Sequence, residues 1–432
     1  MVRKIGLLNH MGGGNLGDDA TQDVVIQNIK IRWPNAEISL FSMNPADTRS
    51  RHGVSAYPIR TESWNPGERR ANGGVTVKSR VKKALQKCPI LLQILHGINT
   101  IAMRAPRRFF NEFRFLSKSF AVLRSFDLLI ISGGGQLLDT WGGPWKFPYT
   151  IFKWTLLAKL SRTKCYFLNV GAGPLTYPLG KWFVRSALGL ADYVSFRDED
   201  SKNLVESVGY TGKSHVAADC VYALDSPAPR ECGPARQSGP LVGLSPMAYR
   251  APRRYWQKDQ AFYERFLEQV ASFANWLGDN RYRLALFSTD IWFDLQTIQQ
   301  VGALLRNGRS GEPPYQVRQE NIAEVNQLLS TIGSMDYIVT CRFHGVVFAH
   351  LLNKPVLALS HHPKVSSLMS DLGLARYCLD IDRCDAGCMQ EAFLAMVANR
   401  DEIKQRMAAK AASYKKTVIA QFDLLFPESA GA

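Results

Sequence analysis

The sequence predicts an α/β fold in which two doubly wound domains face each other across a cleft. Short β-rich runs alternate with longer helical patterns along the chain, which is typical of parallel sheets covered on both faces. Residues 225–240, rich in Pro, Gly and Ser, divide these runs into two series and form the expected linker. The 432 residues, 46% of them hydrophobic, suffice for a core in each half and exclude a disordered chain.

Eleven strands are expected, each an apolar run that ends at turn-forming residues. The first series comprises 5–9, 38–42, 128–132, 165–170, 193–196 and 215–218. The second series comprises 241–245, 283–287, 337–340, 355–359 and 377–379. Helical patterns fall between the strands, for example over 260–277, where Val270, Phe273 and Leu277 keep a three-to-four spacing.

The two series define the expected domains. Residues 1–224 form an N-terminal Rossmann-like domain with a basic insertion at about 45–124, and residues 241–397 form a second Rossmann-like domain. Residues 398–432 are expected as a C-terminal helix that can cross back to the first domain. Because open parallel sheets bind ligands at the carboxyl ends of their strands, we expect the chemistry between the two domains.

Most of the formal net charge of +16 lies in one segment. Between Arg60 and Arg124, nine Arg and five Lys stand against three Glu, an excess of eleven that leaves five for the rest of the chain. This distribution disfavours a uniformly basic nucleic-acid-binding protein. Aliphatic and aromatic residues alternate with the basic ones, which predicts peripheral contact with an anionic membrane through about 60–124. A flap over a binding site and a solvated helix face are the alternatives.

Other general features favour a cytoplasmic protein without a metal ion. The first ten residues lack the apolar core and cleavage site of a secretory signal. Residues 88–103, the longest uncharged stretch of the basic segment, are interrupted by polar residues and are too short for a membrane span. The eight cysteines form no CxxC pair, as is typical of reduced thiols.

The first expected strand runs into a glycine-rich turn before a helix. Gly13, Gly14, Asn15 and Gly17 permit a tight turn with exposed amides, and Asp18 can cap the helix. A helix N-terminus of this kind favours anions. The turn matches neither G-x-G-x-x-G nor a Walker A box, and a turn without a ligand is the alternative.

Two further turns of small residues end strands of the same sheet. The substrate-binding candidates in them are Gly133, Gly134, Gly135, Gln136, Gly171 and Gly173. Several such turns at one edge favour an anion or sugar site more than a single turn does, with purely structural turns as the rival explanation.

An arginine and a histidine follow a core strand of the second half. Arg342 and His344, with Gly345 after them, stand where the strand 337–340 meets a helix. At that position they can hold an anion and a proton donor together. We therefore expect both residues in the catalytic site.

Four other candidates lie after strands. Arg197 suits a carboxylate or phosphate if it faces the cleft, although local pairing with the acidic residues that follow it is an equal alternative. After the strand 355–359, Lys364 can meet a phosphate and His361 or His362 a substrate, or all three are solvent-exposed loop residues. No His/Cys spacing or carboxylate cluster requires a metal.

The motifs follow a familiar order along the chain. They are GGGNLGDDA, SGGGQLLD, VGAGPL, SFRDEDS, AADCV with Asp219, CRFHG and HPKV. This order resembles the polysaccharide pyruvyl transferase family over nearly the whole chain apart from about 45–124. The resemblance implies a fold similar to the GT-B glycosyltransferases. It also implies transfer of a pyruvyl group from phosphoenolpyruvate, as donor substrate, to a saccharide as a ketal, with release of phosphate and without a cofactor.

The resemblance suggests roles for individual residues in cell-surface or extracellular polysaccharide biosynthesis. Arg342 and His344 look like the family's Arg-x-His site for phosphoenolpyruvate, Arg197 looks like the arginine of its Arg-Asp motif, and Lys364 matches a family lysine less closely. His344 is expected to protonate the methylene carbon of phosphoenolpyruvate. The acceptor is a polymer, a nucleotide-activated sugar or a lipid-linked saccharide at a membrane. A GT-B glycosyltransferase that uses a nucleotide sugar and a non-catalytic saccharide-binding protein are competing interpretations.

Overall fold

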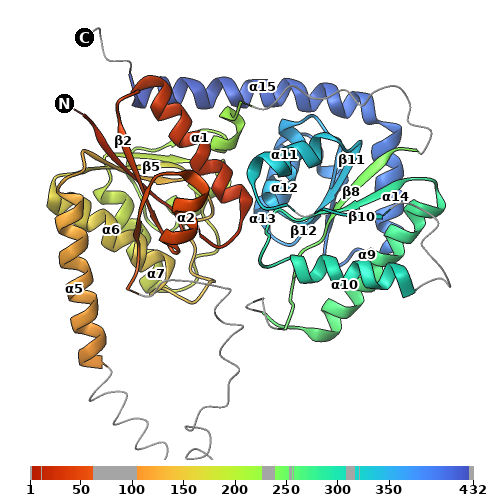
Figure 1. Cartoon of the computed structure of the whole chain (residues 1–432), viewed down its shortest axis with the longest axis horizontal. Helices are drawn as coiled ribbons and strands as arrows, with labels where there is room; N and C mark the ends of the chain where they lie inside the picture. Colours follow the sequence, from red (N-terminus) through yellow and green to blue (C-terminus); the bar gives the residue numbers. More distant parts are fainter. Residues whose placement is uncertain are drawn as a thin grey trace, which may run out of the picture.

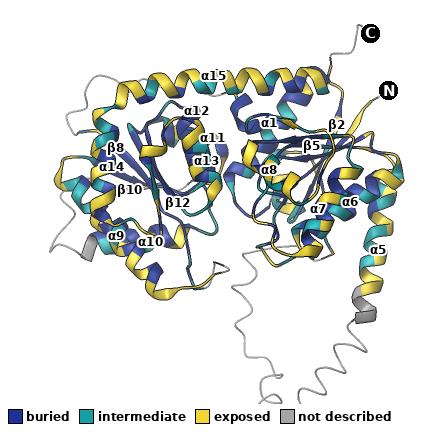
Figure 2. Ribbon diagram, turned by 180° about the vertical axis from the view of Figure 1, so that it is seen from behind, coloured by how far each residue is buried: buried dark blue, intermediate teal, exposed yellow. Residues whose placement is uncertain are grey.

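The computed structural model describes residues 2–10, 12–61, 105–225, 239–252, 255, 257–307, 317–320 and 322–427. The described chain forms two α/β domains side by side, each with a parallel sheet and flanking helices (Figure 1). Burial is concentrated in the two sheets and in the helix faces that cover them, whereas the outer helix faces are exposed (Figure 2). Each domain therefore has its own core.

The first sheet has the strand order β3-β2-β1-β4-β5-β6-β7 in the described part of the chain. Its strands are β1 (Lys4–Leu8), β2 (Glu37–Ser42), β3 (Ser55–Pro58), β4 (Leu128–Ser132), β5 (Lys164–Val170), β6 (Tyr193–Phe196) and β7 (His215–Val216). All neighbouring strands are parallel, and the order reverses between β1 and β4. Ligands bind parallel sheets at such a switch point.

The second sheet has the order β10-β9-β8-β11-β12-β13 over the described residues. Its strands are β8 (Leu241–Ser245), β9 (Arg283–Leu286), β10 (Val317–Gln319), β11 (Tyr337–Thr340), β12 (Val356–Ser360) and β13 (Cys378–Asp380). Its switch point lies between β8 and β11. The two sheets therefore repeat one topology.

Helices connect the strands and cover both sheets. In the first domain they are α1 (Leu16–Arg32), α2 (Pro45–His52), α5 (Ala105–Leu123), α6 (Phe147–Ser161), α7 (Pro178–Leu190), α8 (Glu199–Ser207) and the 3₁₀ helix η3 (Cys220–Ala223). In the second they are α9 (Gln260–Asp279), α10 (Leu295–Asn307), α11 (Val325–Gly333), α12 (Phe343–Leu351), α13 (Pro363–Asp371), η4 (Ala375–Tyr377) and α14 (Ala386–Ala398). Within the described residues, no helix is long and apolar enough to cross a membrane.

All eleven strands expected from the sequence are present, with ends that differ by two residues or fewer. Two more strands, β3 and β10, each form one edge of their sheet. Edge strands pair on one side only and stay short, so a sequence such as SAYP or VRQ carries little strand signal.

The expected insertion at about 45–124 needs correction at both ends. Residues 45–58 form α2 and β3, and β3 pairs with β2 as an ordinary part of the first sheet. At the other end, α5 leads into β4 as a normal crossover helix packed on α6. Residues 62–104, which carry much of the basic segment, lie outside the described residues, as do residues 226–238 of the expected linker.

The last helix, α15 (Arg400–Leu425), runs along both domains (Figure 1). Near its start, Met407 is buried in the core of the second domain. Near its end, Val418 and Phe422 are buried in the core that Ile5 and Leu7 of β1 share. One helix therefore contributes to the cores of both domains.

Candidate functional site

A cleft of about 500 Å³ lies where the carboxyl ends of both sheets meet. Its walls contain these residues expected from the sequence: Gly13, Asn15, Asp18, Gly135, Gln136, Arg197, Arg342, His344, His361, His362 and Lys364. The first six belong to the first domain and the other five to the second. Candidates that are far apart in the sequence thus share one cavity.

The other expected glycines, which do not line this cleft, accommodate side chains of the protein itself. They are Gly14, Gly17, Gly133, Gly134, Gly171, Gly173 and Gly345. A Cβ atom on Gly17 would lie 2.0 Å from His344 Cγ, and one on Gly171 would lie 2.6 Å from Arg197 Cζ. Gly17 and Gly171 therefore leave room for His344 and Arg197, whereas the sequence suggested direct contact of these glycines with the substrate.

The first glycine turn docks the first domain onto the second. The Leu16 amide donates to the Thr289 carbonyl over 2.9 Å, and the Ile291 amide donates to the Gly14 carbonyl over 2.9 Å. The Gly17 amide donates to Asn15 Oδ1, which caps α1. Because protein acceptors engage the amides of Leu16 and Gly17, these two amides are committed to the domain contact and the cap, a correction to the expected anion site.

Arg342 is fixed by two carboxylates that the sequence analysis missed. Its Nε donates to Asp294 Oδ2 over 2.7 Å and its Nη2 to Asp294 Oδ1 over 2.8 Å. Asp290 Oδ2 lies 3.3 Å from Nη2. Burial raises the pKa of Asp290 to about 7, against the opposing effect of Arg342. Both carboxylates come from the loop after β9. The Asp-x-x-x-Asp spacing in this loop is the sequence pattern that could have identified them.

His344 lies in the first turn of α12, between the two domains. Its Nε2 is 3.8 Å from Asp219 Oδ2, which comes from the segment before η3. Burial opposes ionisation of Asp219, but His344 and Arg197 outweigh it and lower its pKa. Burial raises the pKa of Asp18 although His344 opposes the shift. The Asp219 carboxylate of the first domain therefore faces the His344 imidazole of the second.

Arg197 pairs with the acidic residue that follows it and also lines the cleft, so the two alternatives considered for this residue, local pairing and a place in the cleft, both apply. Its Nε donates to Asp198 Oδ2 over 3.2 Å, and its Nη1 lies 4.0 Å from Asp219 Oδ2. Its guanidinium covers the Phe343 ring, with Cζ 4.1 Å from the ring centroid. The arginine thus links the first domain to the first turn of α12.

Lys364 sits among other cations in the cleft. Burial, together with Arg197 and Arg342, lowers its pKa to about 7. His362 Nδ1 accepts from the Lys364 amide and caps α13, and burial lowers the pKa of His362 to about 4. Burial also lowers the pKa of His361, whose Nδ1 lies 3.1 Å from the Cys341 carbonyl oxygen. Both histidines are therefore neutral near pH 7.

The wall formed by the first domain is aromatic and uncharged near β1 and α6. His10 stacks on Phe147 with 3.7 Å between ring centroids, and its Nδ1 lies 2.7 Å from Gln136 Oε1. Burial and nearby Arg60 lower the pKa of His10 to about 3, so this imidazole is neutral. Trp141 also lines the cleft. His10, Trp141 and Phe147 were not expected from the sequence. They meet in the cleft wall because the loop before α6 folds over the end of β1.

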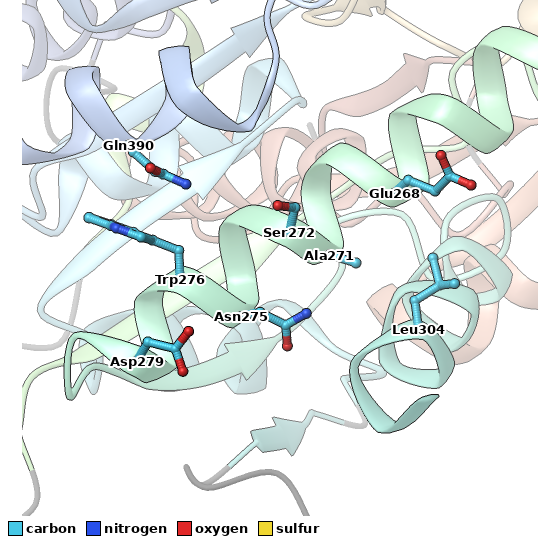
Figure 3. Close-up of a pocket in the computed structure, with 8 residues that line it drawn as sticks. All are labelled: Glu268, Ala271, Ser272, Asn275, Trp276, Asp279, Leu304 and Gln390. Atoms are coloured by element: carbon cyan, nitrogen blue, oxygen red, sulfur yellow. The ribbon is translucent and has the colours of Figure 1, made fainter. Parts of the chain in front are cut away.

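A second hollow, of about 430 Å³, lies on the second domain between α9, α10 and α14 (Figure 3). It is lined by Glu268 and Asp279 with neutral residues such as Asn275 and Trp276, and by no described basic residue. The described part of the chain also brings together no group of three His, Cys, Asp or Glu suited to a metal ion. The cationic interdomain cleft is therefore the candidate site for an anionic substrate.

Solved structures of other proteins have a similar fold. The chain is similar to the UDP-GlcNAc 2-epimerase from Neisseria meningitidis bound to UDP-GlcNAc, with a TM-score of 0.57, 10% identity and coverage of 98% of this chain and 99% of that one. It is also similar to the glycotransferase of kitacinnamycin, with a TM-score of 0.55, 12% identity and coverage of 98% of both chains. These likenesses confirm the predicted GT-B-like fold with two doubly wound domains.

The family follows from the sequence. The model of the polysaccharide pyruvyl transferase family matches residues 15–363, and the chain belongs to this family. The match spans the cleft residues of both domains, from Asn15 to Arg342 and His344. It confirms the resemblance drawn from the motifs and makes the protein a transferase.

Proposed function

We propose that the protein transfers the pyruvyl group of phosphoenolpyruvate to hydroxyls of a saccharide, forming a ketal and releasing phosphate during cell-surface polysaccharide biosynthesis. The observation that carries the proposal is the convergence of Arg197, Arg342 and Lys364 around His344 in the cleft. The mutual repulsion of these cations contributes to the lowered pKa of Lys364. A ligand with a carboxylate and a phosphate relieves this repulsion.

The donor fits the wall formed by the second domain. Arg342 precedes α12 with its guanidinium plane held by Asp294, and the first turn of α12 presents the positive end of the helix dipole. Lys364 begins α13 beside it, and Arg197 closes the site from the first domain. This arrangement supports phosphoenolpyruvate bound with its C3 carbon toward His344.

The acceptor fits the opposite wall. Aromatic rings with neutral amides are typical of carbohydrate sites, because the rings cover apolar sugar faces and the amides pair with hydroxyls. His10, Phe147 and Trp141 supply the rings, and Gln136 and Asn9 supply the amides. The two halves of the cleft thus match the two proposed substrates.

The chemistry begins with proton transfer. Protonated His344 donates its proton to C3 of phosphoenolpyruvate, and C2 gains oxocarbenium character. The first sugar hydroxyl bonds to C2 and gives its proton to a base, for which the Asp290 carboxylate in the cleft wall, with a pKa of about 7, is suited. Asp219 lies beside the proton donor, with its Oδ2 3.8 Å from His344 Nε2.

A second hydroxyl completes the reaction. The C2–O bond to phosphate breaks, the second hydroxyl oxygen bonds to C2, and the ketal closes. The proton held by the base passes to the departing phosphate, and the proton of the second hydroxyl restores the His344 imidazolium. Atoms and charge therefore balance without a redox step or a further cofactor.

The test is an acceptor screen with two donors. The protein is incubated with candidate saccharides and either phosphoenolpyruvate or nucleotide sugars, and products are analysed by mass spectrometry. We expect a mass gain of one pyruvate less water with phosphoenolpyruvate, and matching phosphate release. His344→Gln should abolish the product, whereas His215→Gln, at an exposed imidazole outside the cleft, should not. Glycosyl transfer from a nucleotide sugar, or turnover of His344→Gln near that of the wild type, would refute the proposal.

A further inference from the structure

We propose that an aromatic rim on the first domain docks on an anionic phospholipid bilayer and turns the mouth of the cleft toward the membrane. The aromatic rim is defined by Phe109, Phe110, Phe113, Trp141, Trp145 and Trp182, whose exposed fractions range from 44% to 76%. These side chains come from α5, from the loop before α6 and from α7. These elements are neighbours, since α5 packs on α6 and α6 packs on α7. A group of exposed aromatic residues on neighbouring elements marks an interaction surface.

The topology places this rim at the edge of the sheet that borders the cleft. In a parallel α/β domain the crossover helices run antiparallel to the strands, so their N-terminal turns lie at the carboxyl ends of the strands. Phe109 and Phe110 lie in the first half of α5, Trp145 lies just before α6, and Trp182 lies near the start of α7. Trp141 belongs to both the rim and the cleft wall. The rim therefore continues into the cleft mouth.

The apolar residues of helix α5 differ in burial along its length. Phe115, Leu116 and Phe120 pack against the core of the first domain. Phe109 and Phe113 continue the stripe of Leu116 and Phe120 toward the start of the helix but are exposed there, as is Phe110. The first half of α5 extends beyond the body of the domain (Figure 1). An ordinary solvated face does not carry three exposed phenylalanines, whereas aromatic side chains are favoured at the boundary between headgroups and acyl chains.

Charge identifies the occupant. Basic residues stand beside the tryptophans of the rim, since exposed Lys146 follows Trp145 and half-buried Lys181 precedes Trp182. The nearby carboxylates are engaged within the domain, since Asp139 is buried and accepts from the Thr176 amide, and Glu112 pairs with Lys153 over 2.7 Å. Exposed Arg114 and Lys118 lie on α5 itself. A basic aromatic surface matches anionic headgroups.

Docking in this orientation has a consequence for the substrate. A bilayer at the rim presents lipid-linked saccharides at the cleft mouth, beside Trp141. This consequence rests on the proposed function, whereas membrane binding by the rim does not. The contact is peripheral, through side chains that insert at the interface.

The test measures binding of the full chain to vesicles by sedimentation. We expect binding to vesicles of phosphatidylcholine mixed with phosphatidylglycerol, weak binding to phosphatidylcholine alone, and release by salt. The triple variant Phe109→Ser, Phe110→Ser and Phe113→Ser should bind at least about tenfold more weakly, because it removes three apolar side chains from the membrane contact. Leu424→Ser, at an exposed leucine near the end of α15, is the matched control and should bind like the wild type.

Two further measurements keep the outcomes distinct. Thermal unfolding of the triple variant should match that of the wild type, since the three phenylalanines are exposed. Pyruvyl transfer to a water-soluble acceptor should also be unchanged, so that loss of vesicle binding is separated from failure of the proposed reaction. Equal vesicle binding by the triple variant and the wild type overturns the proposal. A dimer in solution that the triple variant dissociates also overturns it, because the rim is then an interface between copies.

Discussion

His344 owes its position to the absence of a side chain at Gly17. The imidazole packs on the backbone of α1, and a Cβ at this position would lie 2.0 Å from two ring atoms, Cγ and Nδ1. Alanine favours helices more than glycine does, so Gly17→Ala does not weaken α1 by itself. The effect of the substitution therefore falls on the imidazole.

We expect Gly17→Ala to lower kcat roughly a hundredfold, the range for loss of a positioned general acid. Steady-state kinetics and thermal unfolding measure the two effects separately. Gly189→Ala in α7 is the matched control, because a Cβ there meets no described atom within 4 Å. A Gly17→Ala enzyme with wild-type kcat would show that the position of His344 does not matter.

Lys364 should make donor binding depend on pH. Its pKa is lowered from an ordinary 10.5 to about 7, chiefly by burial and then by Arg197 and Arg342. A bound phosphate favours the ammonium form, so binding takes up a proton above pH 7. The affinity for phosphoenolpyruvate should then fall by up to about tenfold per pH unit above that point.

Titration calorimetry over a range of pH measures this dependence directly. Lys364→Gln should bind more weakly at pH 7 and show a flatter dependence above it, because the titrating group is gone. The same slope in both proteins would assign the proton to another group.

At the scale of elements, η3, α12 and α15 meet in a buried contact. The hydroxyl of Tyr222 in η3 lies 2.8 Å from His350 Nδ1 in α12, and His350 Nε2 lies 2.8 Å from the Met407 carbonyl oxygen in α15. Burial lowers the pKa of His350 to about 4, so the imidazole is neutral. The Tyr222 hydroxyl donates to Nδ1, and Nε2 donates to the carbonyl.

Tyr222→Phe should lower the free energy of unfolding by about 2 kcal/mol, because it leaves a buried ring nitrogen without its donor. Chemical denaturation measures the change, and Tyr177→Phe, at an exposed tyrosine, should have little effect.

The same histidine adds a pH dependence. The folded protein binds fewer protons at His350 than the unfolded chain does between pH 6.5 and about 4, so its contribution to stability falls as the pH falls through this window.

The substitution tests the hydrogen bond itself. Equal stability of Tyr222→Phe and the wild type would refute the hydrogen-bond assignment.

At the scale of the whole molecule, α15 joins the two cores. Phe422 is fully buried in the core of the first domain although it lies beyond the last strand of the second. Arg32 of α1 reinforces the contact, with its Nη2 2.5 Å from Asp423 Oδ1. The relative position of the two domains therefore depends partly on this helix.

Phe422→Ala should lower the free energy of unfolding by about 4 kcal/mol, the cost of a large cavity in a core. Leu424→Ala, two residues away at a 70% exposed position, should change it by less than about 0.5 kcal/mol. Denaturant unfolding of both variants provides the comparison. Similar losses in the two variants would mean that α15 does not complete the core of the first domain.

The sequence determined most of the architecture of this protein. Strand position and burial follow from local periodicity, so the eleven expected strands and the placement of Arg197, Arg342 and His344 after strands could be read residue by residue. The edge strands β3 and β10 were missed because pairing on one side demands little of their sequence.

Only the tertiary structure decided which side chains meet at the cleft. Asp294 holds Arg342, Asp219 faces His344, and Gly17 seats the imidazole, although these partners are 48, 125 and 327 residues apart. Such pairs depend on how two domains pack, and no local pattern encodes that packing. The sequence therefore determined where the polar residues stand along each strand, and domain packing decided which charges neutralise, position or repel one another.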